Sequence, residues 1–214
     1  TFINEIANLC EKTNINVEDV SIGIGLDKRI GGRFLRAGPA YGGSCFPKDT
    51  KAITATADKY KINLSLIKAV IKSNKNRSNY LLKRISNICK NKLNNKKITF
   101  LGVTFKANTD DMRDSSSLTM IPALIKKGAK INYYDPTGEK SNFKNYKNVI
   151  FSKDIKSALK NSDLVIIHTE WNDFKSLNFK SLVKKKKFII YDMRNIYIPE
   201  KMKKLKINYY GIGR

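Results

Sequence analysis

A reactive thiol is the feature of this sequence that most clearly predicts chemistry. Cys45 lies in the segment 41–49, which reads YGGSCFPKD. The two glycines before it allow a ligand to approach the backbone closely, and Lys48 is placed to hold the thiol partly as thiolate. Asp49, one helical turn further on, adds a carboxylate that could act as a base. A nucleophile, a cation and a base in one short segment form the arrangement that covalent catalysis needs.

The other cysteines and the single histidine predict no further reactive site. Cys10 and Cys89 are expected to be buried, because a cysteine usually behaves as a small apolar side chain. No second cysteine lies near enough to Cys45 for a CxxC pair, and no histidine stands at metal-ligand spacing, so no metal site is predicted. His168 follows the apolar run 164–167 and is interpreted as the end of a strand. A Cys45–His168 dyad stays open as the less favoured alternative.

The composition is that of a globular protein. At 214 residues the chain can form one large domain or two small ones. No apolar run approaches the length of a membrane span and no signal peptide is apparent, so no membrane partner is expected. Three widely separated cysteines fit a reducing compartment and predict a cytoplasmic protein.

The net charge of +24 raises nucleic acid as a partner. The lysines, however, are spread through every segment, and neither arginine nor aromatic residues gather beside them. A nucleic-acid groove needs its cations on one face, so no nucleic-acid partner is expected. The dense basic run 184–187 precedes an apolar strand pattern and is expected in an exposed loop.

Helical periodicity dominates the first part of the chain. Apolar residues at helical spacing predict a helix from residue 2, and a second short helix from residue 16 or 17 that closes near Gly25. The segment 27–44 is rich in Gly, Arg and Pro without a period, which is typical of a functional loop. A further helix is expected from Asp49 to about Tyr60.

A much longer helix is predicted from about residue 64 to residue 93, with a length of roughly 45 Å. A helix of this length bridges domains or pairs with its copy in a partner subunit. Asn74 interrupts its apolar stripe and is expected either to contact a bound group or to set the register of a helix pair.

The second part alternates strands and helices. Buried strands are predicted at 98–103, 131–135, 164–169 and 188–192, with helices near 116–127, 154–161 and 176–183 between them. This alternation predicts a parallel sheet with helices on both faces, and ligands of such sheets bind beyond the carboxyl ends of the strands. The fold class is therefore α/β: an all-helical domain over 1–93 with a long connecting helix, followed by a Rossmann-like parallel-sheet domain over 94–214.

The first predicted strand lacks the glycine pattern of a dinucleotide site. It is followed by Gly102, Phe105 and Lys106 and not by G-x-G-x-x-G. Lys106, Arg113 and the serines 115–117 at the start of the next helix predict an anion site, although helix capping is favoured for the serines alone.

Several motifs in the same order resemble the nucleotide-sugar dehydrogenase family. They are the segments 2–6 (FINEI), 25–31 (GLDKRIG), 34–39 (FLRAGP), 41–49, 102–106 (GVTFK), 113–117 (RDSSS), 134–136 (YDP) and 169–171 (TEW). They extend over nearly the whole chain. The SCFPKD form around Cys45 is similar to that of family members that act on UDP-glucose.

The resemblance implies a three-part enzyme with an N-terminal Rossmann domain for NAD, a central helical domain and a C-terminal UDP-binding domain. This chain is similar to the last two only. The NAD-binding domain and the family's catalytic lysine and asparagine would lie upstream of Thr1, so the fragment alone is expected to be inactive. A homodimer through the central helical domain is also implied.

The family reaction oxidises UDP-glucose to UDP-glucuronate in two steps with NAD as cofactor. By resemblance, Cys45 forms the thiohemiacetal and thioester and Asp49 positions water, while Lys48 and Arg113 face NAD. The implied substrate-binding residues are Arg29, from the neighbouring subunit, and Phe34, Leu35, Arg36, Ala37, Gly38, Tyr41, Gly42, Phe105, Lys106 and Arg194. Two alternatives stay open: a dehydrogenase for another nucleotide sugar, and a non-catalytic nucleotide-sugar-binding module.

Overall fold

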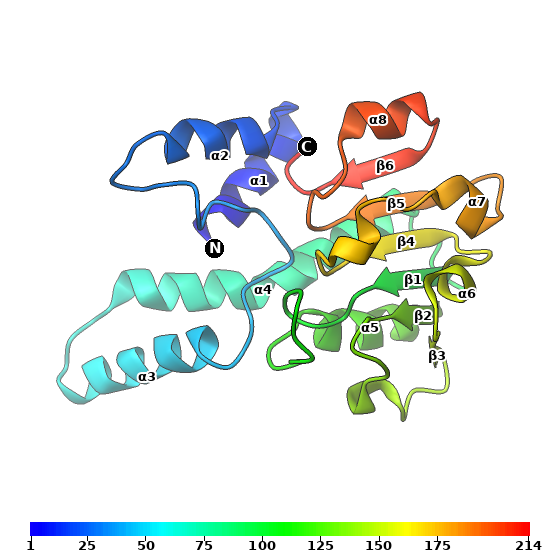
Figure 1. Ribbon diagram of the computed structural model, residues 1–214. Coiled ribbons are helices and arrows are strands. Elements are labelled where there is room, and N and C mark those ends of the chain that lie inside the picture. Colours follow the sequence, from blue (N-terminus) through cyan, green and yellow to red (C-terminus); the bar gives the residue numbers. More distant parts are fainter.

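Four helices precede the sheet in the computed structural model, which describes residues 1–214. They are α1 (Phe2–Thr13), α2 (Val17–Gly25), α3 (Phe46–Lys59) and α4 (Ser65–Ile88). Figure 1 shows α1 and α2 on one side of the N-terminal part, the α3–α4 hairpin on the other, and α4 running from this hairpin toward the sheet. The helices expected from residues 2 and 17 and the loop over 27–44 are confirmed.

Two predicted helix ends were wrong by a few residues. α3 begins at Phe46 and not at Asp49, because Cys45 is its N-cap residue and Pro47 occupies the first turn, where a proline costs no hydrogen bond. α4 ends at Ile88 and not at residue 93. Lys90 and Asn91 adopt left-handed backbone conformations, with φ of 52° and 57°, which stop the helix. Its 24 residues span about 36 Å.

The C-terminal part forms one six-stranded sheet in which every pair is parallel. Its strands are β1 (Lys97–Leu101), β2 (Lys130–Tyr134), β3 (Val149–Phe151), β4 (Leu164–Ile167), β5 (Ile189–Asp192) and β6 (Asn208–Gly211). The order β3-β2-β1-β4-β5-β6 is that of a doubly wound sheet, with the direction of winding reversed between β1 and β4. The predicted α/β class is thus confirmed.

The sequence prediction missed both edge strands and one helix. β3 has three residues and β6 has four, and both carry exposed positions, so neither gives a buried-strand pattern. The remaining helices are α5 (Ser117–Lys126), α6 (Ile155–Leu159), α7 (Phe179–Val183) and the unpredicted α8 (Pro199–Lys204), with short 3₁₀ turns η1 (Ser141–Phe143) and η2 (Asn172–Phe174).

Apolar side chains from the two faces of the sheet enter separate clusters. Along β4, Leu164 and Ile166 point into a cluster of 26 buried residues that also contains side chains of α1, α4 and α5. Val165 and Ile167 point into a second cluster of 13, shared with α6, α7 and α8. Since the larger cluster joins α1 and α4 to the sheet, the two parts of the chain share one core, and the division at residue 93 stays a prediction.

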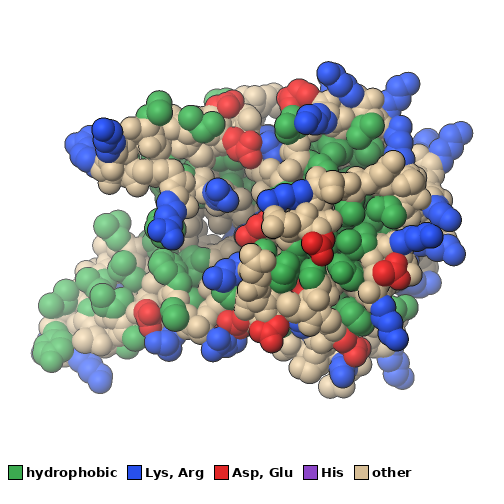
Figure 2. Space-filling view, viewed as in Figure 1, with side chains coloured by type: hydrophobic (Ala, Val, Ile, Leu, Met, Phe, Trp, Pro, Cys, Tyr) green, Lys and Arg blue, Asp and Glu red, His purple; other side chains and the backbone are tan.

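The basic run 184–187 is exposed between α7 and β5, as predicted. Cys10 and Cys89 are buried and Cys45 is exposed, which also agrees with the sequence interpretation. Lys and Arg side chains are spread over the face shown in Figure 2, and several surround the hollow between the α1–α2 and α3–α4 helices. None of the helices combines the length and hydropathy that crossing a bilayer requires.

Candidate functional site

Three loops meet at the point where the winding of the sheet reverses. They follow β1 (residues 102–116), β4 (168–171) and β5 (193–198). In doubly wound sheets, ligands bind at the carboxyl ends of the strands beside this reversal. The loop 31–45 of the helical part reaches the same place, since Gly43 N–H donates to Arg113 O at 2.8 Å.

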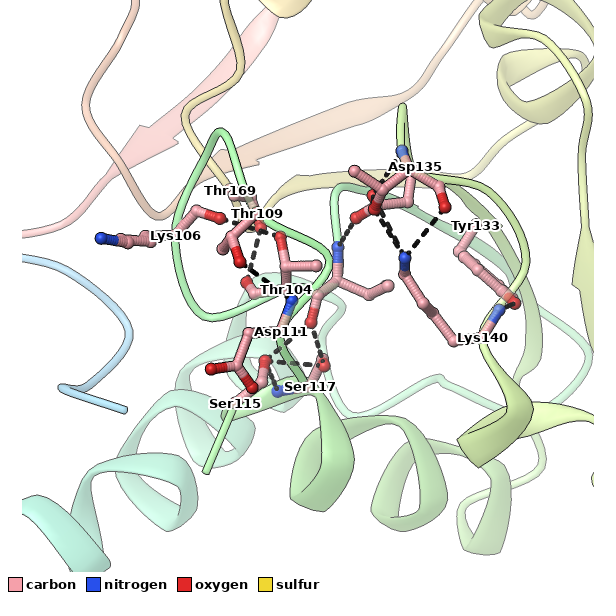
Figure 3. A network of polar contacts seen from close by, with 12 residues as sticks. Thr104, Lys106, Thr109, Asp111, Ser115, Ser117, Tyr133, Asp135, Lys140 and Thr169 are labelled. Atoms are coloured by element: carbon pink, nitrogen blue, oxygen red, sulfur yellow. Dashed lines mark hydrogen bonds and ion pairs between the residues drawn. The ribbon is translucent and has the colours of Figure 1, made fainter. Parts of the chain in front are cut away.

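A network of hydrogen bonds fixes the base of the loop after β1 (Figure 3). Val103 N–H donates to Asp135 Oδ2 at 2.8 Å, and the hydroxyls of Ser115 and Ser117 donate to Val103 O at 2.7 and 2.6 Å. Thr169, after β4, donates to Thr104 O at 2.9 Å. These buried bonds hold the loop in one conformation, so the residues at its tip are placed by the sheet.

The anion site predicted for the serines 115–117 is not assembled. All three serines are buried, and the Ser116 hydroxyl is hydrogen-bonded to His168 Nε2 at 2.8 Å. Ser116 is the N-cap residue of α5, as the capping interpretation predicted, but its hydroxyl accepts no N–H of the helix; the N–H of Ser117 donates to Ser115 Oγ at 3.4 Å. Buried hydroxyls need partners inside the protein, and here the bonds inside the loop network use them. Arg113 instead pairs with Asp111 at 2.9 Å, and Figure 3 shows Lys106 pointing away from the network.

A cleft of about 680 Å³ lies between α2 and the loops after β4 and β5. Three residues of the predicted substrate loop, Leu35, Arg36 and Ala37, line one side, and Arg194 lines the other. The sequence interpretation did not single out the remaining lining residues, which are Val17, Glu18, Ser21, Ile22, Gly25, Leu26, Gly32, Glu170, Lys175, Asn195 and Ile196. Of these, Gly25, Leu26 and Glu170 had carried a signal only as members of the GLDKRIG and TEW motifs.

Arg194 is held rigidly at the edge of this cleft. Its Nε donates to His168 O at 2.8 Å and its Nη2 to Phe105 O at 2.7 Å, while the Glu170 carboxylate lies 3.0 Å from Nε. Nη1 faces Gly38, where an added Cβ would lie 3.5 Å away. Burial lowers the pKa of the guanidinium. A planar cation in a fixed orientation with a remaining donor is suited to binding a phosphate group.

Cys45 is exposed at the N-terminus of α3, and its Sγ lies 3.5 Å from the Ser44 hydroxyl. Lys48, the cation predicted to act on the thiol, pairs instead with Asp49, since its Nζ binds Asp49 Oδ1 at 2.5 Å. This hydrogen bond raises the pKa of Lys48, and the negative charge available on Cys45 adds a smaller contribution in the same direction. The pKa of Arg113 is raised first by its bond to Asp111 and, more weakly, by Cys45. The thiol therefore has cations from two different elements in its neighbourhood.

Phe105 connects the thiol loop with the cleft. An added Cβ on Gly43 would lie 2.7 Å from the Phe105 ring, and one on Gly42 would lie 2.5 Å from Asp114 O. Gly43 also has a φ of +85°, a conformation that only glycine adopts at low cost. Because the carbonyl of Phe105 accepts from Arg194, one residue contacts both the Cys45 loop and the cation of the cleft.

Both the backbone and the side chain of Tyr41 have partners in the helical part. Its N–H donates to Asn74 Oδ1 at 3.0 Å, and Asn74 Nδ2 donates to Tyr41 O at 3.0 Å. The Tyr41 ring packs edge-on against Phe46, with 4.7 Å between ring centres. Asn74, which was expected to contact a bound group or a second helix, thus has partners inside the chain.

Seven of the eleven predicted substrate-binding residues do not line the cleft: Arg29, Phe34, Gly38, Tyr41, Gly42, Phe105 and Lys106. Three of these seven are Arg29, Phe34 and Lys106. The Arg29 side chain is 89% exposed and pairs with Asp27 at 2.7 Å. Phe34 is 88% exposed, and the Lys106 ammonium lies 5.4 Å from the centre of the Phe105 ring. The side chains of these three residues lie outside the cleft lining.

His168 takes no part in a dyad. Its Nδ1 is 3.2 Å from Thr169 Oγ1, and the other ring nitrogen is bonded to Ser116. Since the Thr169 proton is donated to Thr104 O, Nδ1 carries the ring proton and Nε2 accepts from the serine. Burial lowers the pKa of His168 to about 3. The strand-end interpretation is confirmed, and the Cys45–His168 alternative was wrong.

Comparison with known proteins gives two matching family models. Residues 1–76 match the central domain of the UDP-glucose/GDP-mannose dehydrogenase family, and residues 99–199 match the UDP binding domain of the same family. The chain is similar to the UDP-glucose 6-dehydrogenases of Rickettsia felis (43% identity, 99% of this chain and 48% of the relative) and Rhizobium meliloti (43%, 100% and 49%). It therefore spans about half the length of these relatives.

The fold is similar to that of a UDP-glucose dehydrogenase from Pyrobaculum islandicum. The match has a TM-score of 0.84 and 28% identity, and it covers 99% of this chain and 47% of that one. The sequence and structural similarities thus extend over both the helical part and the sheet.

Proposed function

We propose, since this chain belongs to the UDP-glucose/GDP-mannose dehydrogenase family, that it carries the nucleophile and the UDP-sugar site of an NAD-dependent UDP-glucose 6-dehydrogenase. The observation that supports this proposal most strongly is the course of the segment 34–45. One end lines the cleft beside the reversal of the sheet, and the other presents Cys45, exposed, near two cations.

The cleft has the size and chemistry of a nucleotide-sugar site. Its volume of about 680 Å³ lies within the range of small-molecule pockets, which is about 300–1,000 Å³. Arg194 and Arg36 would contact the diphosphate, and the side chains of Leu35 and Ala37 would pack on the nucleoside. Gly38 leaves room for the ligand beside Arg194 Nη1. The sugar would then extend along Tyr41 and Gly42 toward Cys45.

Cys45 would act as the nucleophile in the second half of the reaction. After the C6 alcohol has lost a hydride and a proton, the thiolate attacks the aldehyde carbon and forms a thiohemiacetal. Loss of a second hydride gives a thioester, and water then cleaves its C–S bond, which releases the carboxylate and restores the thiol. Lys48, Arg113 and the N-terminus of α3 place positive charge near the thiol. Asp49 would orient the attacking water.

NAD would accept the two hydrides. The residues of this chain that fit an anionic dinucleotide are Lys48 and Arg113, because both are exposed cations beside the thiol. Their carboxylate partners, Asp49 and Asp111, keep both side chains pointed in defined directions before the cofactor binds.

A second copy of the chain would complete the assembly. Large apolar side chains on the α3–α4 hairpin are exposed, including Tyr60 at 75% and Leu66 at 80%, which supports a homodimer through the helical part. Arg29, exposed on its loop, would reach the substrate of the neighbouring subunit.

The test is to join this chain to the NAD-binding domain of the Rickettsia felis relative and to measure NADH and UDP-glucuronate formed from UDP-glucose. We expect two NADH per UDP-glucuronate. Cys45→Ser should abolish release of the acid, whereas the neighbouring change Ser44→Ala should retain it. Normal production of UDP-glucuronate by the Cys45→Ser protein would refute the nucleophile assignment.

A further inference from the structure

The short segment 38–41 joins the cleft to the nucleophile loop. Gly38 lies beside Arg194 at the cleft, and Tyr41 begins the turn that leads to Cys45. The segment belongs to neither a helix nor a strand. Its backbone therefore has no regular hydrogen-bonding partners, and its conformation must be set by other groups.

Side chains from two helices supply those partners. Gly38 N–H donates to Asn4 Oδ1 on α1 at 2.8 Å, and Arg77 Nε on α4 donates to Gly38 O at 3.2 Å. Asn74, also on α4, both accepts from Tyr41 N–H and donates to Tyr41 O, each at 3.0 Å. The backbone N–H and C=O of both the first and the last residue of the segment are thus bonded to side chains of α1 and α4.

The spacing on α4 explains how one helix can hold both ends. Asn74 and Arg77 are three residues apart, so they lie on the same face of the helix. Arg77 is 4% exposed and also donates to Asn4 O at 3.3 Å, which ties it to the residue that binds Gly38 N–H. Asn74 bonds Tyr41, which is the residue of the segment 38–41 that lies nearest to Cys45 in the sequence.

A hollow of about 520 Å³ lies beside Asn74 and Tyr41, bounded by α3, α4 and the start of α5. Pro47 and Thr50 of α3 line it, together with Ser116. Without the two bonds of Asn74, the Tyr41 backbone would have space to move toward this hollow. Packing alone therefore does not hold the loop in place.

We infer that Asn74 is a positioning residue, which sets the distance between Cys45 and a sugar bound in the cleft by fixing the Tyr41 peptide groups to α4. Asn4 and Arg77 fix the other end of the segment. The inference rests on the proposed function in treating Cys45 as the nucleophile. It adds that the position of this nucleophile relative to the sugar is controlled from a helix, α4, that contributes no residue to the cleft lining.

Asn74 offers a cleaner test than Arg77, because loss of the buried arginine would affect the core. Asn74→Ala removes both bonds and places a good helix former in α4. Asn74→Asp retains the acceptor for Tyr41 N–H, and its carboxyl group can donate to Tyr41 O only when it is protonated. Asn76→Ala is the matched control, because Asn76 is an exposed residue of the same helix.

The first measurement is hydrogen exchange of the Tyr41 amide in the 214-residue chain. Loss of one neutral hydrogen bond changes an opening equilibrium by about fivefold. We therefore expect exchange roughly 25-fold faster in Asn74→Ala, which loses two such bonds, about fivefold faster at neutral pH in Asn74→Asp, which loses one, and within about threefold of the parent in Asn76→Ala. An unchanged Tyr41 amide in Asn74→Ala would overturn the inference.

The second measurement uses the fusion with the NAD-binding domain. Asn74→Ala should lower kcat about tenfold per folded molecule, with the Kd for UDP unchanged within about twofold. For Asn74→Asp, the ratio of kcat to that of the parent should rise as the pH falls, because protonation restores the second bond. A merely structural residue would not give this pH dependence. Unchanged kcat in Asn74→Ala, or a parallel loss of UDP affinity, would overturn the inference.

The two proposals fail in different ways. If Cys45→Ser retains turnover, the proposed nucleophile is wrong and the positioning role falls with it, whatever the exchange result. If Cys45 is required and Asn74→Ala is fully active, the proposed function stands and only the positioning role is refuted.

Discussion

Replacing His168 by glutamine is expected to make the fold less sensitive to acid. His168 is the only histidine of the chain. It is buried behind the loops that form the cleft, and its pKa is lowered to about 3 from an ordinary value of 6.5, chiefly by burial and secondarily by Arg194. The unfolded chain therefore binds a proton below pH 6.5 that the folded chain does not accept until about pH 3. Stability is lost as the pH falls through this window.

The size of the effect follows from the two pKa values. Between pH 7.5 and pH 5, protonation of the unfolded state at this one group lowers the free energy of unfolding by about 2 kcal/mol. His168→Gln removes the titration, while its amide can still bond to the Ser116 hydroxyl. The variant is expected to be less stable than the parent at pH 7.5, through imperfect packing, but the difference should shrink by about 2 kcal/mol at pH 5.

Urea unfolding of the parent and of His168→Gln across this pH range measures the difference in their free energies of unfolding. Titration of the carboxylates changes both free energies equally and therefore cancels in the difference. The imidazole NMR signals of the parent give a second measurement and should not shift between pH 7.5 and pH 5. A difference in stability that is independent of pH, or an imidazole that titrates near 6.5, would refute the reasoning.

Three further outcomes are expected from the site. A thiol reagent should modify Cys45 alone in the native chain and all three cysteines after unfolding; native labelling of a second thiol would contradict the burial pattern. Gly43→Ala should destabilise the chain by more than about 1–2 kcal/mol in urea unfolding, because the left-handed backbone cost adds to a clash with an aromatic ring. Gly23→Ala, in a helix with open space around it, is the control and should not destabilise, so an equal loss in both would count against the close packing of the thiol loop. Arg194→Lys should weaken UDP binding about tenfold or more in calorimetry, since a lysine cannot reproduce the fixed planar group. The exposed control Arg33→Lys should bind normally, and equal affinity of the two variants would remove Arg194 from the phosphate site.

The sequence determined the elements that have strong local patterns. The apolar period of α1, the continuous apolar runs of β1 and β4, and the glycines and proline around Cys45 all depend on residues close in the chain, so they could be identified without coordinates. The short edge strands β3 and β6 could not, because a strand of three or four half-exposed residues has no distinctive pattern.

The thiol segment shows the same division within one site. Its residue types alone marked Cys45 as a nucleophile, and its exposure agrees with that interpretation. The pairing of Lys48 with Asp49, and the presence of Arg113 near the thiol, were not predictable, since both depend on where the side chains and a distant loop lie.

What only the tertiary structure decided is which polar groups remain available to a ligand. The serines 115–117 and Arg113 suggested an anion site, but the fold uses the hydroxyls inside the loop network, whereas Arg194 keeps a guanidinium nitrogen facing Gly38. Likewise, the sequence marked Asn74 as a break in an apolar stripe but not its partner, because it meets both Tyr41 backbone groups only when α4 and the loop are brought together. The physical reason is that residue types and local periodicity are set by neighbours in the chain, while hydrogen-bond partners and buried charge are set by residues far away in it.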